Sequence, residues 1–213
     1  MFFCTPKSQY NTVERSFMIH PDTELRFLNG DVGYGVVATK FIPKGTITWV
    51  LDKLDRTFTP LQIIEMGEVF QEIINTYCYR NRDGNLVLCW DMGRFVNHSF
   101  NSSCISTAYD FEFAVRDIHP GEELTDDYGY LNIDEPFRAV DEGGDRKIVY
   151  PDDLIKYHPM WDKKLISAFR AFPTVPQPLG GLIPAETMDL CHRIAVGQTE
   201  MASIISCYYD PNR

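Results

Sequence analysis

The feature that most constrains the fold is a set of three short strings in a fixed order along the chain. Gly-Tyr-Gly stands at residues 33–35, Arg-Phe-Val-Asn-His-Ser at 94–99 and Gly-Glu-Glu-Leu-Thr-Asp-Asp-Tyr-Gly at 121–129. A single Gly-x-Gly predicts only a tight turn, because glycine adopts turn conformations at little steric cost. The ordered combination is far more specific than any one string, and it carries most of the functional information in the chain.

The composition predicts one well-packed domain. Of the 213 residues, 44% are hydrophobic and 13% aromatic, which is enough for a sizeable core. No apolar stretch approaches the roughly 20 residues needed to cross a bilayer, and the first residues lack the basic and apolar segments of a secretory signal. We therefore expect a soluble intracellular protein, cytoplasmic or nuclear, without a membrane partner.

The net charge of −10 narrows the classes of partner. Such a surface repels a phosphate backbone, so direct binding of nucleic acid is not expected. It favours cationic partners such as a lysine-bearing peptide, although an acidic surface also serves solubility.

Six cysteines are scattered along the chain without a closely spaced pair. Structural zinc sites use ligand pairs a few residues apart, and a disulfide framework is not expected inside a cell. Cys191 and His192 with Cys207 form the one combination that suggests a metal, but buried thiols are the expected role of these cysteines. No metal is predicted.

Two stretches read as strand, turn and strand. Residues 36–50 are rich in Val, Ile, Thr and Trp around a Pro-Lys-Gly turn, and residues 111–125 repeat this pattern around His-Pro-Gly. Such residues favour a pleated surface, and Pro and Gly favour turns. Three residues recur at matching positions, either as a repeat or through turn chemistry alone: Ala38, Ile42 and Gly45 reappear as Ala114, Ile118 and Gly121.

Helices are expected in three places. Thr59, Pro60 and Gln62 form a capping box with proline at the first helical position, which predicts a helix over about 59–79. Residues 152–172 are expected to be helical with an interruption at Pro159, and an amphipathic segment over 185–208 has Gly197 as its weak point. Short strands with an inserted helix and a helical tail predict the α+β class.

Over residues 28–130, the three strings resemble the SET-domain family of S-adenosylmethionine-dependent protein-lysine methyltransferases. The resemblance implies small curved β-sheets around a pseudo-knotted crossing, with residues 1–27 as an N-terminal lead-in and 131–213 as a helical C-terminal extension. The crossing would bring Asn97 and His98 next to Tyr128, although such threading is rare among proteins.

The resemblance also implies roles for particular residues. The glycines of the first string let backbone groups approach the methionine end of the cofactor, and the Asn-His pair holds its adenine and methionine portions. The hydroxyl of Tyr128 lies beside the methyl-transfer axis, where it can orient the lysine nitrogen; a further role as general base is left open. The implied cofactor-binding residues are Gly33, Tyr34, Gly35, Arg94, Asn97, His98 and Tyr128, and Tyr128 is the implied catalytic residue.

The sequence departs from the family at Asp126. An aromatic residue is frequent at this position and helps to set how many methyl groups are added, whereas an acid would either face the lysine channel or turn to solvent. Asp127 fits the family's Asp-Tyr pair and is expected to be structural. Adjacent carboxylates on a strand point to opposite faces, so these two do not resemble the paired acids of a hydrolase.

A second departure is the lack of the cysteine-rich zinc segment that often completes the lysine channel. An aromatic residue of the tail could take its place over the adenine or the channel, or it could pack the tail on the core. The candidates are Trp161, Phe169 and Phe172 in the tail, with Tyr77, Tyr79 and Tyr109 as further candidates for the channel wall.

The function implied by the resemblance is methylation of a lysine in a protein substrate, with a histone among the candidates. The amine must lose its proton first, because free lysine titrates near 10.4, and an apolar channel favours the neutral form by desolvation. The alternatives are a non-catalytic interaction module that keeps the fold and a methyltransferase that acts on another acceptor, because a fold alone does not establish an activity.

Overall fold

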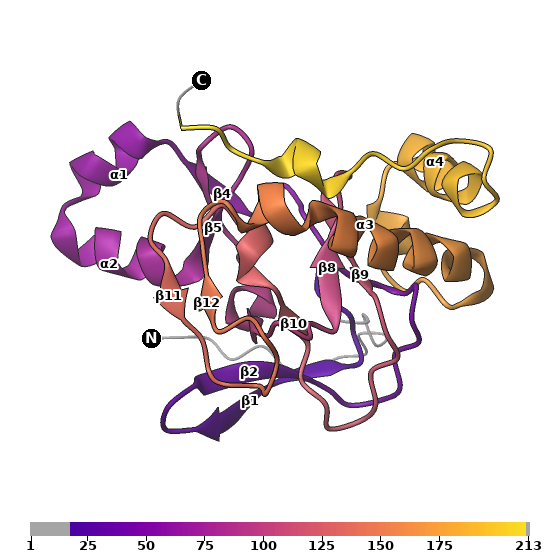
Figure 1. The fold of residues 1–213 in the computed structure, drawn as a ribbon, viewed down its shortest axis with the longest axis horizontal. Helices are drawn as coiled ribbons and strands as arrows, with labels where there is room; N and C mark the ends of the chain where they lie inside the picture. Colours follow the sequence, from indigo (N-terminus) through magenta and orange to yellow (C-terminus); the bar gives the residue numbers. More distant parts are fainter. Residues whose placement is uncertain (1–17, 212–213) are drawn as a thin grey trace, which may run out of the picture.

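The computed structural model describes residues 18–211, so residues 1–17 of the expected lead-in lie outside the described part. Within this part, five small sheets are combined with four α-helices (Figure 1). Helices α1 and α2 project at one end of the molecule and α4 lies at the other, while the β1–β2 hairpin forms an edge between them. The α+β class expected from the sequence is confirmed.

The strands are β1 (Thr23–Asn29), β2 (Gly33–Ala38), β3 (Ile47–Val50), β4 (Arg56–Phe58), β5 (Cys78–Arg80), β6 (Leu86–Leu88), β7 (Asn97–His98), β8 (Cys104–Ser106), β9 (Phe111–Ala114), β10 (Thr125–Asp126), β11 (Phe137–Arg138) and β12 (Ile148–Val149). The α-helices are α1 (Pro60–Met66), α2 (Glu68–Tyr77), α3 (Asp153–Ala171) and α4 (Ala185–Ala195). The 3₁₀ turns are η1 (Met92–Phe95), η2 (Tyr128–Tyr130), η3 (Phe172–Thr174), η4 (Gly180–Leu182) and η5 (Ile204–Cys207).

Four of the sheets are antiparallel and one is parallel. The antiparallel sheets have the strand orders β1-β2, β3-β9-β8, β4-β6-β5 and β11-β12. Strand β10 pairs with β7 in parallel, although β8 and β9 lie between them in the sequence. A parallel pair of strands needs a long connection, so this pairing brings together two segments that are distant in the sequence.

The two similar stretches noted in the sequence pair with each other. Ile42 and Ile118 exchange two backbone hydrogen bonds of 2.9 Å. Around them, Gly45 N–H donates to the Ala114 carbonyl and the Gly121 N–H to the Ala38 carbonyl, each at 2.8 Å. Both glycines have φ of 89°, a conformation that favours glycine. The matching residues therefore lie at matching positions about a local two-fold arrangement.

The inserted segment begins as expected and then divides. The side chain of Thr59 accepts from the Gln62 N–H, and the Gln62 side chain accepts from the Thr59 N–H at 2.9 Å, so the capping box is confirmed. A single helix over 59–79 was wrong: Gly67, with φ of 84° and ψ of 166°, separates α1 from α2. That conformation lies outside the helical region, so the two short helices meet at an angle.

Helix α3 runs through Pro159, so the expected interruption there was wrong. Proline cannot donate to the carbonyl four residues earlier, which belongs to Ile155. Nδ1 of His158 lies 2.9 Å from that carbonyl oxygen and takes the place of the missing partner. The neighbouring histidine thereby offsets part of the cost of proline inside the helix.

Helix α4 ends at Ala195, two residues before Gly197, the expected weak point of this segment. Gly197 has φ of 74°, its N–H donates to the Ile194 carbonyl at 3.0 Å, and the Gln198 N–H donates to the Arg193 carbonyl at 2.8 Å. These two bonds form the Schellman arrangement that satisfies carbonyls at a helix C-terminus. The 3₁₀ turn η5 follows, instead of a continuation of the helix over the expected 185–208.

The largest core cluster lies between the β3-β9-β8 sheet and the tail. Helix α3 packs on β9, η2 and α4. The rings of Phe111 and Phe113 on β9 meet Phe169 of α3 at 6.5 Å and 4.8 Å between centroids. No helix within residues 18–211 combines the length and apolar character required to span a bilayer.

Candidate active site

The parallel pairing of β7 with β10 brings the second and third strings together. Asn97 lies beside Thr125, and His98 lies beside Asp126. The Ser99 N–H donates to the Asp126 carbonyl at 2.9 Å, which extends the pairing by one bond. The third string then turns into η2, where Tyr128 is the first residue. The juxtaposition of the Asn-His pair with Tyr128 is therefore produced by the backbone.

His98 is tied to Tyr128 through the backbone of the latter. The Tyr128 N–H donates to Nδ1 of His98 at 3.1 Å. Burial lowers the pKa of His98, so the ring is neutral near pH 7 and carries its proton on Nε2. Nε2 is buried and has no hydrogen-bond partner among the described residues. A buried donor without an acceptor is unusual and is compatible with a ligand at this position.

Asn97 joins the first string to the third. Its Nδ2 donates to the Tyr34 carbonyl at 3.0 Å and to Oε1 of Glu123 at 2.7 Å. A Cβ on Gly35 would lie 2.5 Å from that Glu123 oxygen and 3.0 Å from Asn97 Nδ2. Gly35 is needed because three side chains of the protein itself approach its backbone, the third being Leu28, whose Cδ1 would lie 2.6 Å from that Cβ. Within residues 18–211, no donor binds the side-chain oxygen of Asn97.

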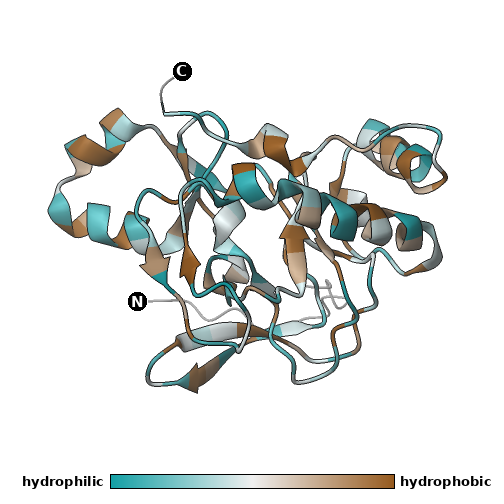
Figure 2. Ribbon diagram, in the orientation of Figure 1, coloured by the Kyte–Doolittle hydropathy of each residue, from teal (hydrophilic) through white to brown (hydrophobic). Residues whose placement is uncertain are grey.

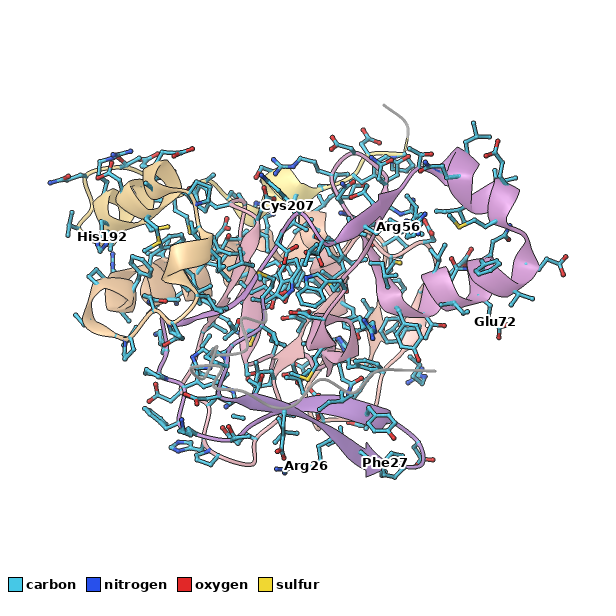
Figure 3. All side chains as sticks on the ribbon, turned by 180° about the vertical axis from the view of Figure 1, so that it is seen from behind. Arg26, Phe27, Arg56, Glu72, His192 and Cys207 are labelled. Carbon is cyan, nitrogen blue, oxygen red and sulfur yellow. The ribbon has the colours of Figure 1, made fainter. Side chains whose placement is uncertain are left out.

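Gly33 and Tyr34 lie at the open end of β2. Gly33 has φ of 81°, and a Cβ there would contact nothing within 4 Å. The Tyr34 ring is 52% exposed, with its centroid 5.5 Å from that of Phe27 and 6.3 Å from that of Phe95. Figure 3 shows Phe27 on the β1–β2 hairpin, at the edge of the molecule opposite Cys207. The first string therefore lies at a surface lined by aromatic rings.

Arg94, the first residue of the second string, binds the backbone that precedes the string. Its Nη1 donates to the carbonyls of Cys89, Trp90 and Asp91 at 3.2, 2.9 and 3.1 Å. Its guanidinium lies 4.9 Å from the centre of the Phe95 ring. These bonds hold the turn that precedes Asn97, while a contact between Arg94 and the cofactor stays a prediction.

Tyr128 lies in the wall of a cavity of about 820 Å³. Its hydroxyl donates to the Val96 carbonyl at 2.7 Å. Burial, together with the charges of Asp126 and Glu123, raises the pKa of this phenol, so it stays protonated near neutral pH. Because the proton is engaged by Val96, the lone pairs of the oxygen are available to accept an N–H.

The cavity is lined by aromatic and acidic side chains. Tyr77 and Tyr79, two of the three tyrosines that the sequence offered as candidates for a channel wall, lie in the wall of this cavity. Tyr109 does not: its hydroxyl accepts from the Ala202 N–H at 2.7 Å, and its ring packs on Phe111 and Phe169.

Asp126 lines this cavity and does not turn to solvent. It is 5% exposed, and burial raises its pKa to about 6. Beside it lies Glu112 of β9, 9% exposed, whose pKa is raised far above its usual value by burial and by Asp126. Glu112 belongs to none of the three strings, although a charged residue in the apolar run Phe-Glu-Phe-Ala is a usable signal in the sequence.

Asp127 points away from the cavity into an ion cluster. Arg146 donates from Nη2 to Asp127 Oδ1 at 3.2 Å and to Asp153 Oδ2 at 2.7 Å, and it also pairs with the second oxygen of Asp127. Asp127 Oδ1 additionally caps η2 by accepting from the Gly129 N–H at 3.1 Å. The expected structural role of Asp127 agrees with these contacts.

The comparisons with known proteins identify this region. A family model described as the SET domain matches residues 33–129. The chain carries a SET domain. Over 117 residues it is 33% identical to the histone-lysine N-methyltransferase ash1 of Drosophila melanogaster. That match covers 49% of this chain and 5% of the relative, so the chain spans only a small part of that protein.

The tail does not place the three aromatic residues considered from the sequence at the site. Trp161 and Phe169 are 0% exposed and Phe172 is 1% exposed, all in the core, so of the two alternatives left open by the sequence these rings pack the tail on the core. Instead, Phe137 of β11 lies against His98 and Tyr128, with centroids 5.5 and 6.1 Å away. Phe137 was overlooked because helical patterns dominate the tail.

The end of the tail also forms part of the cavity wall. Asn132 donates to the Cys207 carbonyl at 2.9 Å and accepts from the Tyr209 N–H at 2.9 Å. The guanidinium of Arg80 lies 5.6 Å from the centre of the Tyr209 ring. Figure 3 shows Cys207 between the two helical ends of the molecule. Hydrogen bonds and packing hold this wall.

In the fold, the two cysteines of the combination that suggested a metal, Cys191 and Cys207, have separate surroundings. Cys191 is fully buried in the core on α4, whereas the Sγ of Cys207 donates to the Thr107 carbonyl at 3.7 Å. Within residues 18–211, no group of three or more His, Cys, Asp or Glu side chains is arranged to hold a metal ion.

Proposed function

We propose that this SET-domain protein transfers a methyl group from S-adenosylmethionine to the side-chain amine of a lysine in a protein substrate. The observation that carries the proposal is the position of Tyr128. Its backbone N–H binds His98, while its hydroxyl binds the Val96 carbonyl in the wall of the cavity. One residue therefore links the Asn-His pair to a cavity that can admit a lysine side chain.

The residues present are compatible with the cofactor. Asn97 fixes the backbone of Tyr34 and keeps its own oxygen available, and His98 offers a buried Nε2–H that has no partner in the part of the chain that the structure describes. With Gly33, Gly35 and Arg94, these are the residues that would hold S-adenosylmethionine. When bound, the cofactor supplies a methyl group activated by a positively charged sulfur.

The protein's own contribution is to bind and orient the amine. A neutral amine must direct its lone pair at the methyl carbon, so its N–H bonds need acceptors on other sides. The Tyr128 oxygen is such an acceptor, because its proton is engaged by Val96. The raised pKa of Tyr128 argues for this orienting role and against a role as general base at neutral pH.

The charge of the site favours a cationic substrate. The cavity lining contains more acidic side chains than basic ones, and the whole chain carries −10. Such a field steers cationic partners and raises their association rate. The relative is named a histone-lysine N-methyltransferase, so we take core histones as the first substrate class, which would place the reaction in the nucleus.

The test is transfer of radiolabelled methyl from S-adenosylmethionine to core histones and to lysine peptides. We expect labelling by the wild type and its loss in Tyr128→Phe, with Tyr150→Phe at an exposed tyrosine as the matched control. Cofactor binding, measured by calorimetry, without turnover on any lysine substrate would instead support the interaction-module alternative.

A further inference from the structure

Two buried carboxyl groups lie side by side in the cavity that Tyr128 faces. Asp126 comes from β10 and Glu112 from β9, and both line the cavity. Ser106 donates to Glu112 Oε1 at 3.2 Å. Burial and the negative charge of Asp126 raise the pKa of Glu112, so the two carboxyl groups interact. Oδ1 of Asp126 is buried without a partner among the described residues. A buried carboxylate oxygen without a partner, on a residue that lines a cavity, points to a ligand that donates hydrogen bonds.

The groups around this pair do not neutralise it. The titratable groups that interact with it are Tyr79 of β5, Cys89, Asp91, Cys104 of β8, Asp127, and Tyr128 and Tyr130 of η2. The arginines that line the cavity have other partners: Arg80 pairs with Asp134, Arg82 with Asp110 at 3.6 Å, and Arg94 with three backbone carbonyls. Asp127 has its own counter-ion in Arg146.

Two carboxyl groups in contact inside a protein do not readily both ionise, because burial and mutual repulsion oppose the second charge. Near neutral pH the pair therefore holds one proton and a net charge of −1. This charge lies in a cavity that also contains the Tyr128 hydroxyl. The missing partner is a cation that fits the cavity, and a lysine ammonium has that chemistry.

We propose that Asp126 and Glu112 together accept the proton that the substrate ammonium must lose before methyl transfer, an inference that rests on the proposed function. One N–H bond of the ammonium breaks and one O–H bond forms on the pair. The ammonium becomes a neutral amine, the pair goes from −1 to 0, and the proton passes to water when the site reopens. A neutral amine beside a neutral pair is favoured in a desolvated site, where ion pairs lose their hydration.

Asp126, an acid at a position where aromatic residues are frequent in the family, thus has a role in removing the proton from the substrate ammonium. Tyr128 keeps its proton and orients the nitrogen, whereas the Asp126–Glu112 pair removes the proton that blocks the lone pair. The first role belongs to the hydroxyl oxygen of Tyr128, and the second belongs to the carboxyl oxygens of the pair.

The first test does not depend on turnover. Carboxyl carbons labelled with ¹³C report the protonation of each acid by NMR, and n-butylamine serves as a probe of the lysine side chain, with n-pentanol as its neutral control. At pH 7.5 we expect n-butylamine to move the signals of Asp126 and Glu112 toward the protonated state. Ordinary carboxyl titration of both residues, or the same response to n-pentanol, would overturn the proposal.

The second test is the pH profile of kcat/KM with core histones. The kcat/KM of the wild type should stay constant between about pH 7 and 9, because the pair removes the proton from the amine at every pH in this range. Asp126→Asn/Glu112→Gln should be about 100-fold slower at pH 7, within the range of general-base effects. Its kcat/KM should then rise about tenfold per pH unit, because it uses only the neutral fraction of the amine.

The control is Glu186→Gln, the same chemical change at an exposed residue on α4, and thermal melting checks that each variant is folded. A double variant slowed equally at every pH would show that the pair is merely structural. If the wild type transfers no methyl group but n-butylamine still protonates the pair, the proposed function fails while the amine site stands. If the wild type is active and both profiles coincide, the function stands and this proposal fails.

Discussion

Tyr128 separates two regions of the site that are built from different kinds of residue. On one side, Asn97 and His98 bind backbone groups of the first and third strings, so the strings hold one another. On the other side, Asp126 and Glu112 line a cavity, and one oxygen of Asp126 has no partner within residues 18–211. The first region matches the SET-domain strings throughout, whereas the second departs from them.

The difference has a physical reason. A cofactor that is the same throughout a family needs the same backbone approaches and the same donors, and these produce short recognisable strings. A substrate channel needs only a shape and a charge, which many side chains from separate strands can supply. The cavity side is therefore where we expect properties specific to this protein.

The largest expected effect is a loss of stability from the ion cluster around Arg146, which supports both sides of the site. Arg146→Ala leaves Asp127 and Asp153 buried without a counter-ion, because Arg146 pairs with both. Breaking a buried ion pair in this way costs about 3–5 kcal/mol. Urea denaturation should show this loss in the free energy of unfolding. Arg138→Ala, at an exposed arginine, should change it by less than about 0.5 kcal/mol. Equal losses in the two variants would contradict the assigned role of the cluster.

Tyr128→Phe should affect the transfer step and spare the cofactor side. Removing the hydroxyl takes away an acceptor for the amine, which we expect to lower kcat by about 100-fold. The backbone bond from residue 128 to His98 remains, so cofactor affinity should change by less than about threefold. Radiolabel transfer and calorimetry on the same sample measure the two effects. A large loss of cofactor affinity would remove the distinction between the two sides.

Asn97→Ala should have the opposite profile. The variant loses the bonds to the Tyr34 carbonyl and to Glu123, and with them the link between the first and third strings. A hydrogen bond to a charged group contributes about 1.5–3 kcal/mol, so we expect cofactor affinity to fall at least about tenfold in calorimetry. Asn101→Ala, at an exposed asparagine, is the control. Unchanged affinity in Asn97→Ala would contradict the assignment.

The smallest expected effect concerns the protonation of His98. Its pKa in the folded protein is lowered by burial, so its contribution to stability is full above the unfolded value of about 6.5 and is lost as the pH falls toward the folded value. Melting temperatures between pH 8 and 5 should therefore fall more in the wild type than in His98→Gln. ¹⁵N NMR should find the proton on Nε2 near pH 7. A proton on Nδ1 would conflict with the bond from the Tyr128 N–H.

Local signals in the sequence were reliable where local chemistry decides the structure. The capping box at Thr59 and the helix end at Gly197 are set by residues within one turn. The break at Gly67 was overlooked because the apolar spacing continues across it. The interruption expected at Pro159 does not occur, because His158 supplies a partner for the carbonyl that proline leaves open.

The positions of the site residues depended on contacts between distant segments. The strings predicted that Asn97, His98 and Tyr128 meet, and the β7–β10 pairing brings them together. Neither Glu112 nor Phe137 belongs to a string, so only the fold brings them to the site. The same holds for the tail aromatics, because one-dimensional patterns do not distinguish a ring that fills the core from a ring that covers a ligand.

Cofactor titration of Asp126→Asn/Glu112→Gln beside Asn97→Ala tests most directly whether the two sides of Tyr128 have separate tasks. Both variants are titrated with S-adenosylmethionine by calorimetry at pH 7. We expect the double variant to bind the cofactor like the wild type, although it transfers methyl groups about 100-fold more slowly, and Asn97→Ala to bind at least about tenfold more weakly. Equal loss of cofactor affinity in both variants would contradict the account.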